Sequence, residues 1–223
     1  KKSFYYTIKG NFDFGVSYIG NYIPKENDPV DDKKRILDRD FAESVKNSIH
    51  GKPSLILSAT TESKKTPPPL PYNLLTLQSD ASRKFGYKPD QVKAITQELR
   101  EKYQLITYNR SDCEYLNEEM HDDAPAVLSA ISQNSNLFKN VVLNANPSIK
   151  SRAFNSHKVS AHHAIIPTQS TYDVNMLKEE LKNVYFLIAR AYIAQFYPKY
   201  EYEETTIITE CSGHQFKTIS NVP

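Results

Sequence analysis

"ESKKTPPPLP", residues 62–71, divides the sequence into parts of different character. Three consecutive prolines can neither continue the hydrogen-bond ladder of a sheet nor lie inside a helix, and proline runs favour a stiff, extended backbone. The sequence before this stretch contains strand-like alternation of apolar and polar residues, whereas the sequence after it has apolar residues at helical spacing. We therefore expect a domain boundary at the prolines.

On the N-terminal side, alternation over residues 4–18 predicts two strands, and we place the turn between them at residues 9–11. A helix is predicted to begin near Asp40, whose carboxylate is expected to cap it, and to end before Gly51. A further strand is predicted at residues 54–61. This part of the chain is thus expected to be rich in strands.

On the C-terminal side, helical spacing predicts one helix that ends at Gly86 and a second that opens at Pro89. With residues 105–108, "LITY", as a following strand, the pair resembles a winged helix-turn-helix, although most helix pairs in proteins bind nothing. Further helices are predicted over residues 123–134 and 177–196.

Strands are predicted again from residue 201 onwards. The fold class expected is therefore α+β, in which residues 1–66 and 200–223 form one discontinuous, strand-rich domain. Residues 67–199 would form a mainly helical, winged-helix-like lobe inserted into that domain. The chain would then cross between the two domains twice.

Composition limits the classes of function. A net charge of +2 on 223 residues gives no overall field for a nucleic acid, so a polyanion would require a local basic patch. Two cysteines without a CxxC pair favour a reduced, cytoplasmic compartment. No apolar run has transmembrane length, so no membrane partner is expected. The first residue is Lys rather than Met, and we expect the chain to be a piece of a longer protein.

The stretch "LITYNRSDCEYL", residues 105–116, places Tyr108 where an apolar run meets a polar cluster. A tyrosine can attack a phosphodiester if nearby cations favour its phenolate form and hold the phosphate. Arg110 would lie on the same face as Tyr108 in an extended backbone and can contact a phosphate with two N–H groups. The alternative is a strand tyrosine whose hydroxyl is tethered to Arg110 or Asp112.

A second candidate is "KVSAHHAIIPT", residues 158–168, with the adjacent pair His162 and His163. Neighbouring residues in an extended segment point to opposite sides, so at most one histidine is expected to face a given site. No cysteine or acid stands at zinc-ligand spacing nearby, and no metal site is predicted. The alternative is one histidine in the core and the other on the surface.

Together these stretches resemble the type IA DNA topoisomerases, and more closely their topoisomerase III branch. The resemblance runs from residue 67 to residue 198 and is loose in the strand-rich flanks. The segment around Tyr108 is similar to the family signature I-T-Y-P-R-S-D-C-x-Y-L, with Asn109 in place of the proline. The motif H-H-A-I-I-P-T follows in the family's order.

The resemblance implies that Tyr108 forms a 5′-phosphotyrosyl link with one DNA strand, so that a strand can be passed and the break resealed without a nucleotide cofactor. It implies that Arg110 is the active-site arginine and that His162 approaches the scissile phosphate. The DNA-binding residues expected with them are His163, Lys158, Ser111, Asp112, Gln78 and Arg83.

The resemblance also implies that the strand-rich domain is a gate and that the helical lobe is the catalytic-tyrosine domain. The family's acidic Toprim domain has no counterpart in this sequence. Mg²⁺ is therefore expected in the complete enzyme, with its ligands in the missing Toprim domain, no cofactor in this chain, and no activity of this chain alone. The implied partners are single-stranded regions of DNA and that Toprim domain, and a helicase is a candidate partner.

Two other interpretations were considered. A tyrosine recombinase requires two widely separated arginines and its own tyrosine context, which this sequence lacks. A non-catalytic winged-helix module, in which Tyr108 stacks on bases, remains an alternative. A covalent adduct with a labelled oligonucleotide would distinguish an enzyme from such a module.

Overall fold

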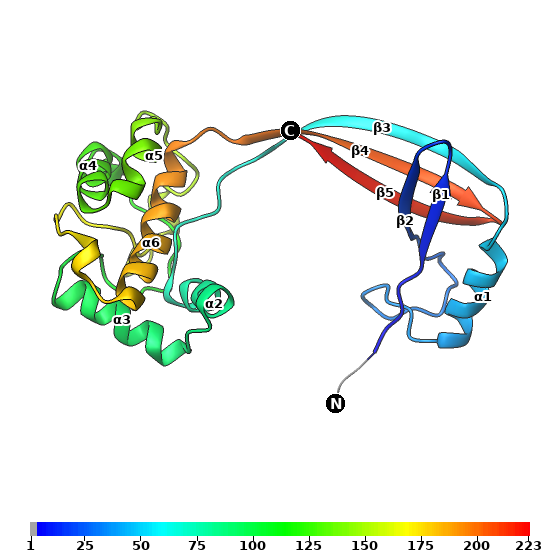
Figure 1. The fold of residues 1–223 in the computed structure, drawn as a ribbon, viewed down its shortest axis with the longest axis horizontal. Coiled ribbons are helices and arrows are strands. Elements are labelled where there is room, and N and C mark those ends of the chain that lie inside the picture. Colours follow the sequence, from blue (N-terminus) through cyan, green and yellow to red (C-terminus); the bar gives the residue numbers. More distant parts are fainter. Residues whose placement is uncertain (1–3) are drawn as a thin grey trace. The chain divides into compact units, whose positions relative to one another are not determined.

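The computed structural model describes residues 4–223, which form two compact units (Figure 1). The sheet unit comprises the residues up to Lys65 together with Glu201–Pro223, and the helical unit comprises Thr66–Tyr200. The chain thus passes into the helical unit just before the proline run and leaves it after Tyr200. None of the described helices is long and apolar enough to cross a lipid bilayer.

The sheet unit is built on a five-stranded sheet with the strand order β1-β2-β5-β4-β3. The pairs β1–β2, β2–β5 and β4–β5 are antiparallel. Strands from both ends of the chain therefore share one sheet. Its strands are β1 (Lys9–Asp13), β2 (Ser17–Tyr22), β3 (Ser54–Thr66), β4 (Tyr200–Cys211) and β5 (His214–Val222).

The first hairpin turns later than the sequence predicted. Residues 9–11, the expected turn, lie within β1, and the turn falls at residues 14–16. Gly15 has a φ of 85°, a left-handed conformation that glycine adopts without a steric penalty. Asp13 Oδ1 accepts a hydrogen bond from Gly15 N at 2.9 Å, which closes the turn.

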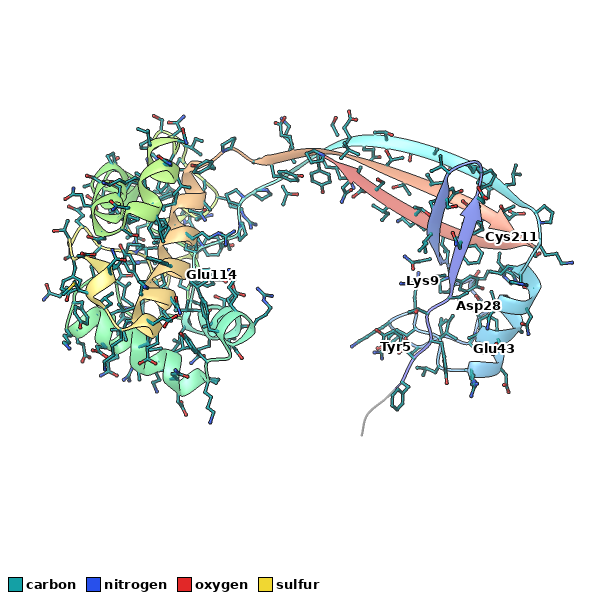
Figure 2. The ribbon with its side chains drawn as sticks, viewed as in Figure 1. Tyr5, Lys9, Asp28, Glu43, Glu114 and Cys211 are labelled. Atoms are coloured by element: carbon teal, nitrogen blue, oxygen red, sulfur yellow. The ribbon has the colours of Figure 1, made fainter. Side chains whose placement is uncertain are left out.

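Helix α1 (Arg39–Ile49) covers part of the sheet. It begins one residue before Asp40 because Asp38, not Asp40, is its N-cap and accepts hydrogen bonds from two backbone N–H groups of the first turn. Ala42 and Val45 of α1 join the small core of the sheet unit. Cys211, at the end of β4 (Figure 2), donates its thiol hydrogen to the carbonyl of Ile49 at 3.7 Å.

The helical unit is organised around α6, which lies between the α2–α3 pair and the α4–α5 pair (Figure 1). Tyr185 of α6 is fully buried, and its hydroxyl accepts a hydrogen bond from Asn134 Nδ2 of α4 at 3.1 Å. The helices are α2 (Leu74–Phe85), α3 (Pro89–Glu101), α4 (Ala124–Asn134), α5 (Lys139–Leu143) and α6 (Glu179–Ile193).

The prediction of a strand after α3 is wrong. Residues 105–108 form no strand, and only Ile106 makes an isolated bridge, to Pro167. A side chain replaces part of the backbone ladder here, because Thr107 Oγ1 accepts the hydrogen bond from Ile166 N at 3.0 Å. Between Pro67 and Lys199 the described chain has bridges but no β-strand. The helix pair therefore lacks the wing of a winged helix.

Candidate active site

Tyr108 follows a segment that is fixed from both sides. Gln104, just after α3, has a φ of 55° and reverses the chain. Leu105 O then accepts a hydrogen bond from Thr168 N, and Thr107 N donates to Ile166 O, both at 3.0 Å. Residues 105–107 consequently lie beside residues 164–168, so the two motifs singled out in the sequence are brought together.

This pairing places Tyr108 against His162. The two ring centroids are 4.1 Å apart, and the ring planes are inclined by 32°. Tyr108 is half-buried and His162 is exposed. His163 is oriented differently, with Nδ1 2.8 Å from the carbonyl oxygen of Ala164. One histidine of the pair therefore contacts the tyrosine, and the other contacts the backbone of the motif.

Arg100 is a site residue that the sequence did not reveal. It lies in the last turn of α3, and its guanidinium carbon is 4.7 Å from the centroid of the Tyr108 ring. This is the geometry of a cation–π contact. The two residues belong to different elements and meet because the chain reverses at Gln104. No local spacing rule pairs them, so only a prediction of that reversal could have identified Arg100.

Arg110 does not contact Tyr108 in the way the sequence suggested. The expectation assumed an extended backbone, but Asn109 and Arg110 form a turn. The Arg110 side chain is exposed, and its Nη2 donates to Gln97 Oε1 of α3 at 3.4 Å. Arg110 thus lies two residues after Tyr108, with its guanidinium directed to α3 at the edge of the site.

Asn109 and Ser111 are anchors rather than exposed contacts. Each is 1% exposed. Asn109 Nδ2 donates to Thr96 Oγ1 at 3.2 Å, inside α3. Ser111 Oγ accepts from Cys113 N at 3.1 Å, within the loop. A buried hydroxyl in this position cannot reach a nucleic acid, so the structure does not support Ser111 as a DNA contact.

The remaining predicted DNA contacts are spread along the unit. Asp112 is exposed, and its backbone carbonyl accepts from Asn73 Nδ2 at the start of α2. Lys158 is exposed and donates through Nζ to the hydroxyl of Tyr115 at 3.3 Å. On α2, Gln78 donates to a backbone carbonyl, and Arg83 pairs with Asp80 at 2.6 Å. Within residues 4–223, no hydrogen bond, ion pair or ring contact joins these four side chains to Tyr108, whose ring contacts are with His162 and Arg100.

The described residues do not offer a metal site. Within residues 4–223, no three His, Cys, Asp or Glu side chains gather closely enough to hold a metal ion. Mg²⁺ requires several oxygen ligands in near-octahedral geometry. The donor set present here does not fit that ion, and we derive no catalytic step through it.

Comparison with known proteins identifies relatives of this chain and a solved structure with a similar fold. The model of the DNA topoisomerase family matches residues 1–222. DNA topoisomerase 3 of Vibrio cholerae is 39% identical over 186 residues, which cover 83% of this chain and 29% of that protein. DNA topoisomerase 3 of Salmonella typhimurium is 41% identical over 187 residues, 83% of this chain and 28% of that protein. The structure of full-length topoisomerase I from Thermotoga maritima has a TM-score of 0.60 and 25% identity, and the match covers 97% of this chain and 34% of that one.

The fold of this chain, with a helical unit and a sheet made of strands from both ends of the chain, is thus similar to that of a solved topoisomerase I. The chain belongs to the DNA topoisomerase family. The similarity to proteins named DNA topoisomerase 3 confirms the topoisomerase III resemblance seen in the sequence. The chain spans less than a third of the length of these curated relatives.

Proposed function

We propose that this chain is the gate and nucleophile portion of a type IA topoisomerase of the topoisomerase III kind. In this proposal Tyr108 cleaves one strand of a single-stranded DNA region, another strand passes, and the break is resealed, so that DNA is relaxed or decatenated. The observation that carries the proposal is the 4.1 Å contact between the rings of Tyr108 and His162, which come from two separate motifs.

The chemistry follows from the groups at the site. Tyr108 Oη attacks phosphorus, an O–P bond forms, and the bond from phosphorus to the 3′ oxygen breaks. The phenol loses one proton and the released 3′ oxygen gains one, so the step is balanced. Resealing is the reverse attack by the 3′ hydroxyl, and the covalent link conserves the phosphodiester energy. No nucleotide cofactor is therefore required.

The neighbours of Tyr108 have separate roles in this proposal. The His162 ring holds the phenol ring in place and offers an N–H donor to a phosphate oxygen. Arg100 contacts the ring face of Tyr108 and helps to hold the ring in place. Arg110 is exposed at the edge of the site and can pair with a neighbouring phosphate through two N–H groups.

We further propose that Mg²⁺ serves the complete enzyme through ligands in a Toprim domain of the same protein, which packs against the Tyr108 surface. On this proposal the chain alone binds single-stranded DNA weakly, because a net charge of +2 provides few phosphate contacts. It neither cleaves nor relaxes DNA by itself. A helicase partner belongs to the same proposal.

The test is covalent capture of a labelled, single-stranded oligonucleotide by a full-length topoisomerase 3 that carries this chain, followed by denaturing electrophoresis. Tyr108→Phe should abolish the labelled adduct and leave oligonucleotide affinity within a few-fold, because only one hydroxyl is lost. Tyr103→Phe removes another tyrosine hydroxyl from the helical unit and should leave the adduct unchanged. An adduct that persists in Tyr108→Phe would refute the assignment. Binding without any adduct in the unaltered protein would favour the non-catalytic module.

A further inference from the structure

The helical unit contains a cavity whose lining does not include Tyr108, His162, Arg100 or Arg110. The cavity has a volume of about 650 Å³. Its walls are the proline run at residues 67–69, Phe138 and Val141 near α5, and Ile193 and Tyr197 at the end of α6. All of its lining residues belong to the helical unit. The volume falls within the range typical of small-molecule sites.

The walls of this cavity are held in place by hydrogen bonds. Gln195 is fully buried, and its Nε2 donates to Pro69 O at 2.7 Å. Arg152 Nη2 donates to Pro68 O at 3.4 Å, and the hydroxyl of Tyr197 donates to Val141 O at 2.6 Å. Proline rings add a fixed backbone φ. The pocket is therefore preformed, and a ligand that enters it orders few protein groups.

One cation lines this apolar pocket. Arg190, in the last turn of α6, is exposed and also lines a neighbouring cavity that contains Arg83 and Lys84. Among the described residues, no hydrogen bond or ion pair engages the Arg190 guanidinium. The one carboxylate of the neighbouring cavity, Asp80, accepts hydrogen bonds at 2.6 Å from the Tyr72 hydroxyl and from Arg83. The charge of Arg190 is therefore available to a ligand.

We propose that this pocket binds an organic anion with a flat apolar body, whose acidic group pairs with Arg190. Aromatic and proline side chains favour a flat ring, and the single cation favours an acid over a neutral or basic compound. Such a ligand touches Pro67, where the chain enters the helical unit, and Tyr197, where it is about to leave. Binding therefore holds the entering and leaving segments together. The proposal does not depend on the chemistry at Tyr108.

The experiment is a pair of fluorescence titrations of the chain. 8-Anilinonaphthalene-1-sulfonate has a flat apolar body and a sulfonate, and N-phenyl-1-naphthylamine has the same ring system without the charge. Arg190→Gln should weaken binding of the sulfonate about tenfold, as expected for loss of a charged hydrogen-bond partner, and leave binding of the neutral probe unchanged. Unchanged binding of the neutral probe also shows that the variant is folded. Ala194→Leu fills the pocket and should weaken both probes.

Two control variants separate this pocket from general surface binding. Lys182→Gln removes another cation of α6, and Leu55→Ser removes an exposed apolar residue of β3. Both should bind the two probes as the unaltered chain does. Equal sulfonate affinity in Arg190→Gln, or loss of binding in Leu55→Ser, would overturn the proposal. Displacement of the sulfonate probe by an oligothymidylate, in the unaltered chain but not in Arg190→Gln, would instead assign the pocket to nucleic acid and also overturn it.

Discussion

The helical unit and the sheet unit bury their side chains to very different extents. In the helical unit, residues from α2, α3, α4 and α6 join one continuous core, in which Leu77, Leu99 and Leu181 are fully buried. In the sheet unit a much smaller cluster lies between α1 and the sheet. None of the thirteen residues of β3 is buried.

This difference in burial indicates that the helical unit positions the side chains around Tyr108, whereas the long strands of the sheet unit serve as connecting elements. The contacts of Tyr108 require that three segments of the helical unit keep fixed positions relative to one another, and a close-packed core provides that rigidity. The long strand β3 gains little from burial and is linked to β4 by pairs such as Lys64–Glu204 at 2.6 Å. Their hydrogen-bond ladders maintain direction over a long distance, which suits a connecting element.

The largest expected effect tests the two cores directly. Leu99→Ala in α3 removes a fully buried side chain and should lower the free energy of unfolding of the helical unit by about 2–5 kcal/mol. Leu57→Ala in β3, where the leucine is 44% exposed, should change the free energy of unfolding of the sheet unit by less than about 0.5 kcal/mol. Chemical denaturation followed by circular dichroism measures both. Equal losses would contradict the comparison.

The next prediction separates the site from the core that supports it. His162→Ala and Arg110→Ala should each cost about 2–4 kcal/mol of transition-state stabilisation in strand cleavage, as loss of one preorganised donor does. Both side chains are exposed, so stability should not change. Arg110→Lys should recover only part of the rate, because the planar fork is lost. Cleavage rates in the full-length enzyme, with exposed His157→Ala as control, decide whether these residues are merely structural.

A smaller effect is expected at Arg100. Arg100→Gln removes the cation from the face of Tyr108. It should raise the activation free energy of cleavage by about 0.5–1 kcal/mol, the usual size of an exposed cation–π contact. Arg100→Lys should restore most of the rate, because the charge is retained. Lys93→Gln removes an exposed cation from the same helix and serves as the matched control. The same slowing in both glutamine variants would show a general charge effect and no specific contact.

The smallest effect concerns the sheet unit and pH. Burial, and secondarily Lys25, lowers the pKa of His214, and Asp28 opposes them. Nδ1 of His214 is buried without a hydrogen-bond partner among residues 4–223. The unfolded chain therefore binds more protons between the lowered pKa and the ordinary value of about 6.5, so the free energy of unfolding should fall as pH drops through that window. His214→Gln should flatten this dependence in denaturation curves from neutral to mildly acidic pH. His50→Gln, at an exposed histidine of the same unit, should leave it unchanged.

Elements with strong local signals could be predicted from the sequence. Gly86 and Pro89 fix the end of α2 and the start of α3, because each restricts the backbone by itself. The predicted position of the first turn was wrong because two glycines, Gly10 and Gly15, could each form it. Pairing with β2 places Gly10 inside the strand β1, so the turn forms at Gly15. No local rule decides between them.

The site was likewise predictable only where local sequence signals are strong. Tyr108 and His162 stood out through their motifs, and the structure brings them into contact. The strand expected at residues 105–108 fails because a side-chain hydroxyl, that of Thr107, replaces part of the backbone pairing. Arg100 and the buried position of Ser111 depend on how the chain turns at Gln104 and at Asn109. Such turns result from tertiary packing, which residue spacing does not encode.

The buried side chain of Asn109 has a mechanical consequence. In the proposed function, a strand of DNA joined covalently to Tyr108 would pull on the backbone whenever that strand is under tension. On one side of the tyrosine, Thr107 is tied to residues 164 and 166, and on the other side Asn109 is tied to Thr96 within α3. The force is thus divided between two anchored neighbours and passes into a helix and its core. The covalent link can therefore be under tension without the tyrosine being displaced from its site.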